Sequence, residues 1–163
     1  MIDTSTDTLP DNTRHRELVD EAATTALGRQ FAGALQGGGL VVYLHGDLGA
    51  GKTSFARALL GALDVGERIK SPTYSLVEGY EAQGRPAWHL DLYRIADPGE
   101  LEWLGLDALA DPAALVLVEW PERGRGALPA EDMVIDMAYA GAGRQATLRP
   151  LTARGRQVLA RLG

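Results

Sequence analysis

The sequence predicts a single α/β domain with three layers, in which helices flank a mixed, partly parallel sheet. The first observation is a buried-strand pattern at residues 40–44, followed by a glycine-rich turn and a helical pattern at residues 54–60. The second is the apolar run at residues 114–120, which is typical of a central parallel strand. The third is a pair of strand patterns, at residues 77–80 and 87–92, that favours an antiparallel hairpin. A chain of 163 residues, 45% of them hydrophobic, is long enough for one domain with a substantial core.

Composition excludes several classes of protein. The net charge of −6 argues against broad binding to nucleic acid or to anionic membranes. The chain has no cysteine, which excludes disulfides and cysteine-based zinc sites. No apolar run approaches the length of a membrane span, and the N-terminus lacks a signal-peptide pattern. We therefore expect a cytoplasmic protein without membrane contact.

The N-terminal part predicts a tail followed by a helix. Residues 1–16 are polar with few apolar anchors, so we expect a disordered tail there and a domain formed by residues 17–163. Apolar residues then recur at helical spacing from Asp20 to Gln36 and predict an amphipathic helix. Three consecutive glycines, residues 37–39, end this helix and lead into the strand that follows.

The turn at residues 46–53, Gly-Asp-Leu-Gly-Ala-Gly-Lys-Thr, fits the phosphate-binding loop pattern between the strand and the helix that this pattern requires. Its glycines allow successive N–H groups to converge on one anion, and the helix directs its positive end to the same point. Lys52 supplies a charge for the β- and γ-phosphates, and the Thr53 hydroxyl suits a Mg2+ ligand. With 14 Arg and only 2 Lys in the chain, a lysine here indicates a need for a compact ammonium group. The alternative is a purely structural glycine-rich turn.

The segment after this helix predicts a loop and a hairpin. Pro72 blocks a central strand at its own position, so we expect residues 70–77 to begin as an exposed loop. The Ser71 and Thr73 hydroxyls could meet phosphate, a metal or a partner, and a plain loop before an edge strand is equally consistent. Residues 81–86 then form the expected turn of the hairpin.

Alternation in the second hairpin strand separates two sets of side chains. Residues 88, 90 and 92 face one side, whereas His89, Asp91 and Tyr93 face the other. Asp91 thus lies at a strand end, where a merely solvated acid is common. A short helix is expected at residues 97–106, since Asp97 is a suitable cap.

The strand at residues 114–120 ends in an acid, as Walker B strands do. Glu119 is expected at the same sheet edge as the glycine-rich loop, where its carboxylate would reach Mg2+ directly or through water. The alternative is an ordinary salt-bridged acid at a strand end. Two more strands, at residues 133–139 and 145–149, and a helix at residues 152–161 complete the domain.

Five segments in this order are more specific than the loop alone. They are the loop itself, the segment Ser-Pro-Thr-Tyr-Ser-Leu-Val at residues 71–77, His-Leu-Asp-Leu-Tyr-Arg at residues 89–94, Glu-Trp-Leu-Gly-Leu at residues 102–106 and Val-Glu-Trp-Pro-Glu at residues 118–122. On these segments the chain resembles the bacterial TsaE (YjeE) family, from about residue 18 to about residue 150. One departure is Ser75, where a second threonine is usual.

The resemblance implies a P-loop NTPase-like fold and a small ATPase that binds ATP and Mg2+ and hydrolyses ATP slowly alone. It implies partners, TsaD and TsaB, with which the family attaches threonylcarbamoyl to adenosine 37 of tRNAs reading codons that begin with A, so tRNA is met only through the complex. It also implies Thr53 and Glu119 as metal ligands, with Lys52 and Asp91 as catalytic residues, Asp91 positioning or activating water. The nucleotide-binding residues expected from the loop pattern and the resemblance are Gly46, Asp47, Leu48, Gly49, Ala50, Gly51, Lys52, Thr53, Ser54, Thr73, Trp120 and Arg144.

Two other functions share the same motif. A small-molecule kinase would carry an arginine-rich lid, and no such segment stands out in the sequence. A nucleotide-gated switch, in which hydrolysis is incidental, would use the same residues and stays open. A small GTPase is disfavoured, because the chain has no Asn-Lys-x-Asp element for guanine.

Overall fold

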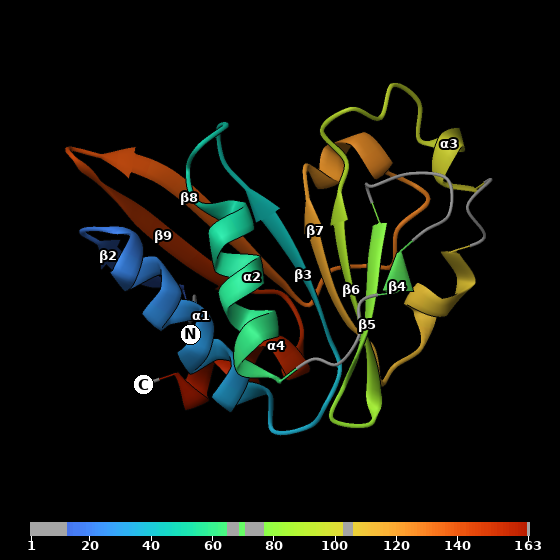
Figure 1. Cartoon of the computed structure of the whole chain (residues 1–163), viewed down its shortest axis with the longest axis horizontal. Coiled ribbons are helices and arrows are strands. Elements are labelled where there is room, and N and C mark those ends of the chain that lie inside the picture. The colour runs from blue at the N-terminus through green and yellow to red at the C-terminus, as the bar shows by residue number, and fades with distance from the viewer. Residues whose placement is uncertain (1–12, 65–68, 71–76, 103–105, 163) are drawn as a thin grey trace, which may run out of the picture.

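The computed structural model describes residues 13–64, 69–70, 77–102 and 106–162. Within these ranges strands and helices alternate along most of the chain (Figure 1). In chain order the elements are β2 (Arg14–Leu18), α1 (Glu21–Leu35), β3 (Leu40–His45), α2 (Lys52–Ala62), β4 (Ile69–Lys70), β5 (Val77–Ala82), β6 (Arg85–Asp91), α3 (Gly99–Glu102), η1 (Leu106–Ala110), β7 (Leu115–Glu119), η2 (Pro121–Gly124), β8 (Met133–Ala140), β9 (Gly143–Pro150) and α4 (Ala153–Arg161).

The strands form one eight-stranded mixed sheet in the order β2-β9-β8-β3-β7-β6-β5-β4. The four central strands β8, β3, β7 and β6 are parallel, and each side of the sheet continues in antiparallel strands. Strand β7 is buried along its whole length, as the unbroken apolar run predicts for a central strand. The predicted mixed, partly parallel sheet is therefore confirmed.

Two apolar clusters cover the two faces of the sheet. On one face α1, α2 and α4 pack against the strands, and the buried rings of Phe31 and Phe55 meet edge to face with centroids 5.6 Å apart. On the other face Leu101 of α3 and Leu109 of η1 cover Val116 of β7. The three-layer arrangement is thus present. None of the described helices is long and apolar enough to cross a membrane.

The start of the domain differs from the prediction. We expected residues 1–16 to form a disordered tail, but residues 14–16 belong to β2, an edge strand paired antiparallel with β9. Leu18 is the buried end of this strand, whereas the residues before it are mainly polar and gave no apolar alternation. The pairing of Arg14 with Leu148 and of Leu18 with Arg144, far along the chain, could not be predicted from the local pattern. Residues 1–12 lie outside the described part of the chain.

The turn of the β5–β6 hairpin is shorter than expected, and so is the described helix that follows it. The turn between β5 and β6 needs only Gln83 and Gly84, both with positive φ, rather than the six residues 81–86. The helix predicted at residues 97–106 is described only as α3, with Gly99 N donating to the Asp97 side chain. Most of the loop expected at residues 70–77 lies outside the described residues.

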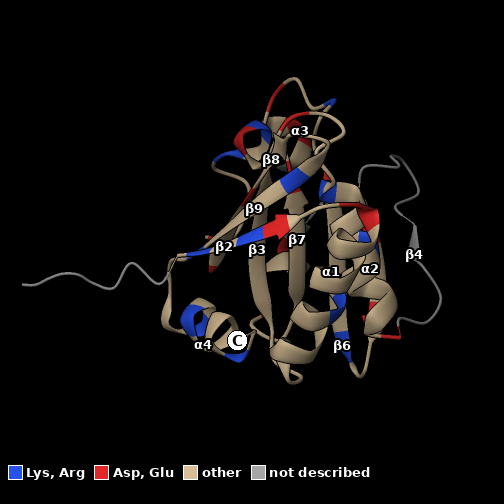
Figure 2. Ribbon diagram, turned by 90° about the vertical axis from the view of Figure 1, so that its left-hand side faces the viewer, with Lys and Arg blue, Asp and Glu red and all other residues tan. Residues whose placement is uncertain are grey.

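Arginines gather on the side of the molecule formed by β2, β9 and α4 (Figure 2). Two of those on α4 serve the fold: Arg154 donates to the carbonyls of Leu35 and Gly39, and Arg161 donates to the carbonyl of Ala34. Helix α1 has no basic residue in its own last turn, so these guanidinium groups supply donors to its C-terminal carbonyls.

Candidate nucleotide and metal site

The carboxyl ends of three parallel strands meet at one edge of the sheet. The register places Leu44 of β3 beside Glu119 of β7, and Glu119 beside Asp91 of β6. Strand β3 continues directly into the glycine-rich loop, whereas β6 and β7 end in the two acids. Pairing between strands therefore brings the loop and both carboxylates to one place, as expected for ligand sites in parallel sheets.

The glycines of the loop adopt backbone conformations that other residues disfavour. Gly46, Gly49 and Gly51 have φ angles of 146°, 79° and 106°. A Cβ on Gly46 would lie 2.4 Å from the carbonyl oxygen of Met137, so β8 leaves no room for a side chain there. Helix α2 begins at Lys52, directly after Gly51, and its free N–H groups face the loop. The result is an anion-binding cradle at a helix N-terminus.

Lys52 is the cation of this cradle. Its side chain is 4% exposed, its ammonium donates to the Gly46 carbonyl, and Nζ lies 3.6 Å from the centroid of the Trp120 ring. Burial lowers the pKa of Lys52, while the carboxylates of Glu119 and Asp91 oppose that shift. Trp120 reaches this position because it takes the left-handed conformation, with φ 58° and ψ 50°, directly after β7. A strained non-glycine residue of this kind is often found at a functional site.

Thr53 and Glu119 form the oxygen-rich part of the site. The Thr53 hydroxyl oxygen lies 2.8 Å and 2.9 Å from the two carboxylate oxygens of Glu119, to which it donates its proton. Glu119 is only 2% exposed, so its charge is held among donors rather than in water. His89 adds a further contact, with Nε2 2.6 Å from Oε2 of Glu119.

Asp91 and two aromatic rings close the site on the β6 side. The backbone N–H of Tyr93 donates to Oδ1 of Asp91 at 3.1 Å, and the centroids of the Tyr93 and Trp120 rings lie 5.0 Å apart. A cavity of about 200 Å³ lies between these groups and the loop. Its lining residues are Leu48, Gly49, Gly51, Lys52, Thr53, Ser54, Asp91, Tyr93, Glu119 and Trp120.

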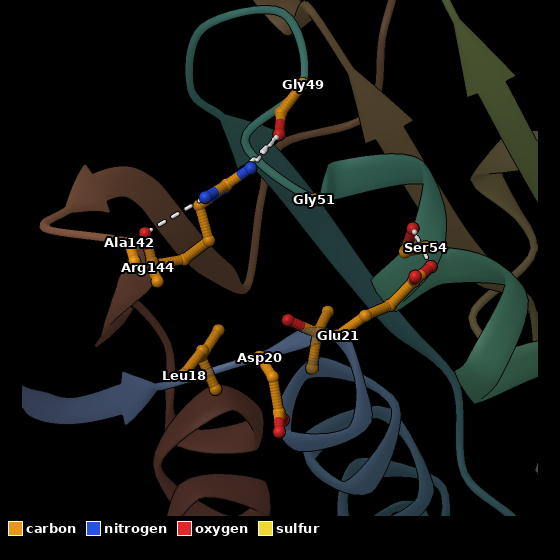
Figure 3. A pocket seen from close by; sticks show the side chains of 10 residues that line it. Leu18, Asp20, Glu21, Gly49, Gly51, Ser54, Ala142 and Arg144 are labelled. Carbon is orange, nitrogen blue, oxygen red and sulfur yellow. Dashed lines mark hydrogen bonds between the residues drawn. The ribbon is translucent and has the colours of Figure 1, made fainter.

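A second cavity, of about 310 Å³, adjoins the first on the other side of the loop (Figure 3). It lies between the start of α1, the loop and the β8–β9 hairpin, and both cavities share Gly49, Gly51 and Ser54. Arg144 Nε and Nη2 donate to the Gly49 carbonyl at 3.2 Å and 3.1 Å, so this guanidinium braces the loop from the hairpin. The remaining lining residues are Leu18, Asp20, Glu21, Thr24, Ala142, Gly143 and Arg144.

The donor set suits Mg2+ together with a polyphosphate. Thr53 and Glu119 offer hard oxygen atoms, which Mg2+ prefers, and Mg2+ characteristically takes one or two protein ligands with phosphates and water for the rest. Among the described residues no group of three or more His, Cys, Asp or Glu side chains could hold a metal ion by itself. A metal here would therefore share its coordination with the ligand in the cradle.

The structure brings most of the predicted site residues together. Residues 46–54 form the loop and the start of α2, and Asp91, Glu119 and Trp120 line the smaller cavity with them. Arg144 reaches the loop from β9 and lines the larger cavity. Thr73 lies outside the described residues. The chemical roles assigned to these residues stay predictions.

Two residues of the site, His89 and Tyr139, are not predicted from the sequence. Alternation predicts His89 on the same side of its strand as Asp91. The bond from His89 to Glu119 depends in addition on the β6–β7 pairing, which no local pattern reveals. The Tyr139 hydroxyl donates to the Leu48 carbonyl at 2.7 Å, and the Arg144 guanidinium lies 4.2 Å from the Tyr139 ring. Tyr139 lies at every second position of β8 with the buried Met133, Ile135 and Met137, but it is half exposed and supports the loop.

Known proteins are similar to this chain in sequence and fold. A family model described as "Threonylcarbamoyl adenosine biosynthesis protein TsaE" matches residues 18–146. A Haemophilus influenzae protein named tRNA threonylcarbamoyladenosine biosynthesis protein TsaE is 38% identical over 144 residues, which cover 86% of this chain and 91% of that protein. A Bacillus subtilis protein of the same name is 38% identical over 103 residues, covering 63% and 64% of the two chains. The crystal structure of YdiB from Bacillus subtilis superimposes with a TM-score of 0.73 at 28% identity, over 92% of this chain and 93% of that one.

Proposed function

This chain belongs to the TsaE family of tRNA threonylcarbamoyladenosine biosynthesis, and we propose that within this role it is a Mg2+-dependent ATPase. One observation carries the proposal. The glycine-rich loop, Lys52, Thr53 and Glu119 surround one cavity at the carboxyl edge of the sheet. A loop of backbone donors, a lysine and an oxygen pair for a metal are the parts that phosphoryl transfer requires.

We propose that the two adjoining cavities hold different parts of the nucleotide. We assign the phosphates to the smaller cavity, because it contains Lys52 and the loop amides. The base and ribose then belong in the larger one, on the far side of Gly49 and Gly51, where Arg144 and Thr24 lie. In this arrangement Thr53 and Glu119 would hold Mg2+, which would neutralise phosphate charge. Asp91 would orient the attacking water or accept its proton.

We expect slow hydrolysis by the isolated chain because of the charges in the smaller cavity. Among its lining residues Lys52 is the cation, and no arginine is present. A positive group supplied in trans is worth on the order of 10³-fold or more in phosphoryl transfer. We propose that a partner protein completes the site, and that the partners are TsaD and TsaB, with tRNA contacted through their complex.

The rim of the site supports a partner on this face. Leu48 is 58% exposed, Tyr139 52% and Tyr93 39%, although all three are large apolar or aromatic side chains. Leu48 belongs to the loop, the Tyr139 hydroxyl donates to the Leu48 carbonyl, and Tyr93 lines the smaller cavity. Apolar side chains gathered at the mouth of a site are a common feature of protein interfaces.

ATP turnover by the purified chain, with and without TsaD and TsaB, tests the proposal. We expect slow turnover alone, a marked rise with the partners, and loss of activity in Lys52→Ala and Glu119→Ala. No turnover even with the partners present would contradict the ATPase assignment. Fast turnover by the chain alone would contradict the proposal that a partner completes the site. An Asp91→Ala variant separates hydrolysis from gating, because it should bind ATP without cleaving it. If that variant still supports tRNA modification, the protein is a nucleotide-gated switch.

A further inference from the structure

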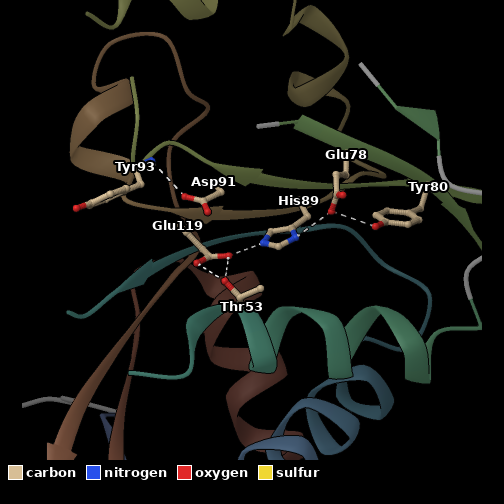
Figure 4. A network of polar contacts seen from close by, with 7 residues as sticks. All are labelled: Thr53, Glu78, Tyr80, His89, Asp91, Tyr93 and Glu119. Atoms are coloured by element: carbon tan, nitrogen blue, oxygen red, sulfur yellow. Dashed lines mark hydrogen bonds and ion pairs between the residues drawn. The ribbon is translucent and has the colours of Figure 1, made fainter. Parts of the chain in front are cut away.

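His89 makes the shortest contact in a chain of polar groups that leads away from the site (Figure 4). Nε2 lies 2.6 Å from Oε2 of Glu119, whose carboxylate also receives the Thr53 hydroxyl. On the other side of the ring, Nδ1 lies 3.6 Å from Oε1 of Glu78 on β5, beyond hydrogen-bond distance. The Tyr80 hydroxyl donates to that same Glu78 oxygen at 3.2 Å.

The position of His89 is set by the sheet rather than by its neighbours in sequence. Its register partner on β7 is Leu117, two residues before Glu119. The side chains of His89 and Glu119 therefore project from the same face of the sheet, toward α2. The imidazole is 5% exposed and is therefore excluded from water. Burying an imidazole without a hydrogen-bond partner costs free energy, so the bond to Glu119 offsets the cost of burying this ring.

We propose that His89 is a positioning residue that orients the Glu119 carboxylate for Mg2+. With a proton on Nε2, the imidazole donates to Oε2 and fixes that oxygen, while the Thr53 hydroxyl contacts both carboxylate oxygens. Thr53 and Glu119 both line the smaller cavity, where the metal would lie. Groups that hold metal ligands in place in this way typically change metal affinity 10–100-fold when they are removed.

This inference rests on the proposed function, since it requires that Glu119 bind a metal. It assigns His89 no contact with ATP and no step in the reaction. The expected defect is therefore specific: metal binding weakens, while nucleotide binding in the absence of metal is unchanged.

The test measures Mn2+ binding by electron paramagnetic resonance, in the presence of the non-hydrolysable analogue β,γ-imido-ATP. In His89→Leu, which lacks the donor, we expect Mn2+ affinity to fall about 10–100-fold. His89→Gln, whose amide can donate to Glu119, should retain affinity within a few-fold of the wild type. His15→Leu is the matched control, because His15 is an exposed histidine that contacts Thr147, and neither residue lines either cavity.

Other outcomes are distinguishable. If the wild type binds neither the analogue nor Mn2+, the proposed function fails. If the wild type binds both and His89→Leu binds Mn2+ equally well, the positioning role fails. Should His89→Leu not fold, His89→Asn replaces it, since its shorter amide cannot reach Glu119. Equal loss of Mn2+ in the Asn and Gln variants would show that His89 is needed only for packing, and would overturn the inference.

Discussion

Replacing Gly51 with alanine places a side chain where the backbone disfavours one. Gly51 precedes α2 with φ 106° and ψ 8°, and a Cβ there would lie 3.1 Å from Cε of Met137. The end of the methionine side chain is flexible and can move aside, so the main cost comes from the backbone conformation. Holding a non-glycine residue in the left-handed region costs about 1–3 kcal/mol. The expected loss in free energy of unfolding is therefore about 1–3 kcal/mol.

Gly61→Ala, within α2, is the matched control, and we expect it to raise the free energy of unfolding rather than lower it. Gly61 lies in the last turn of α2, has no positive φ, and a Cβ there would have nothing within 4 Å. Alanine stabilises a helix relative to glycine by up to about 1 kcal/mol. For a chain of this length each kcal/mol moves Tm by about 2–4 °C, so the two variants should melt on opposite sides of the wild type.

Chemical denaturation gives the free energies, and melting with ATP and Mg2+ reports binding. A ligand at 100 times its Kd adds about 2.7 kcal/mol of stability. We expect this shift in Gly61→Ala and a much smaller one in Gly51→Ala, because the alanine distorts the phosphate cradle. If Gly51→Ala were as stable as Gly61→Ala, the assignment of a glycine-only conformation at Gly51 would be wrong.

Three further perturbations follow from the same structure. Arg144→Gln removes both donors to the Gly49 carbonyl and should weaken ATP binding about 10-fold, as measured by calorimetry, a loss of about 1.4 kcal/mol. Arg149→Gln on the same strand, whose exposed ion pair is worth little, should leave that binding unchanged, and equal weakening in both would refute the bracing role. Thr53→Val should raise the Mg2+ concentration needed for half-maximal turnover at least 10-fold, whereas Thr53→Ser should stay near the wild type; an unchanged Mg2+ requirement in Thr53→Val would exclude this hydroxyl as a ligand. Burial, helped by Glu131, raises the pKa of Tyr43 to about 12, so the unfolded chain releases this proton first and stability should fall as the pH rises from about 10 to about 12. Urea denaturation at pH 9 and pH 11 should show a smaller alkaline loss in Tyr43→Phe than in the wild type, and equal losses would contradict the shift.

Local requirements made much of this protein predictable. The loop is recognisable because phosphate binding demands glycines at fixed spacing, and Lys52 and Thr53 must follow them directly. Helix α1 begins and ends close to the limits predicted from helical spacing and the glycines, and the Asp20 side chain caps it by accepting from the Ala23 N–H. Strand β7 was recognisable from its uninterrupted apolar run, because a central parallel strand is buried on both faces.

Contacts between distant segments were decided only by the tertiary structure. Strand β2 has no strong pattern of its own and is defined by pairing with β9. The bond from Arg144 to Gly49 spans 95 residues, and that from His89 to Glu119 spans 30 and depends on which strands are neighbours. The spacing and type of residues indicate the backbone conformation and the local contacts of a single segment. The order of strands in a sheet depends on the packing of the whole core, so the chemical ingredients of the site are visible in the sequence, whereas the contacts that hold them in place are not.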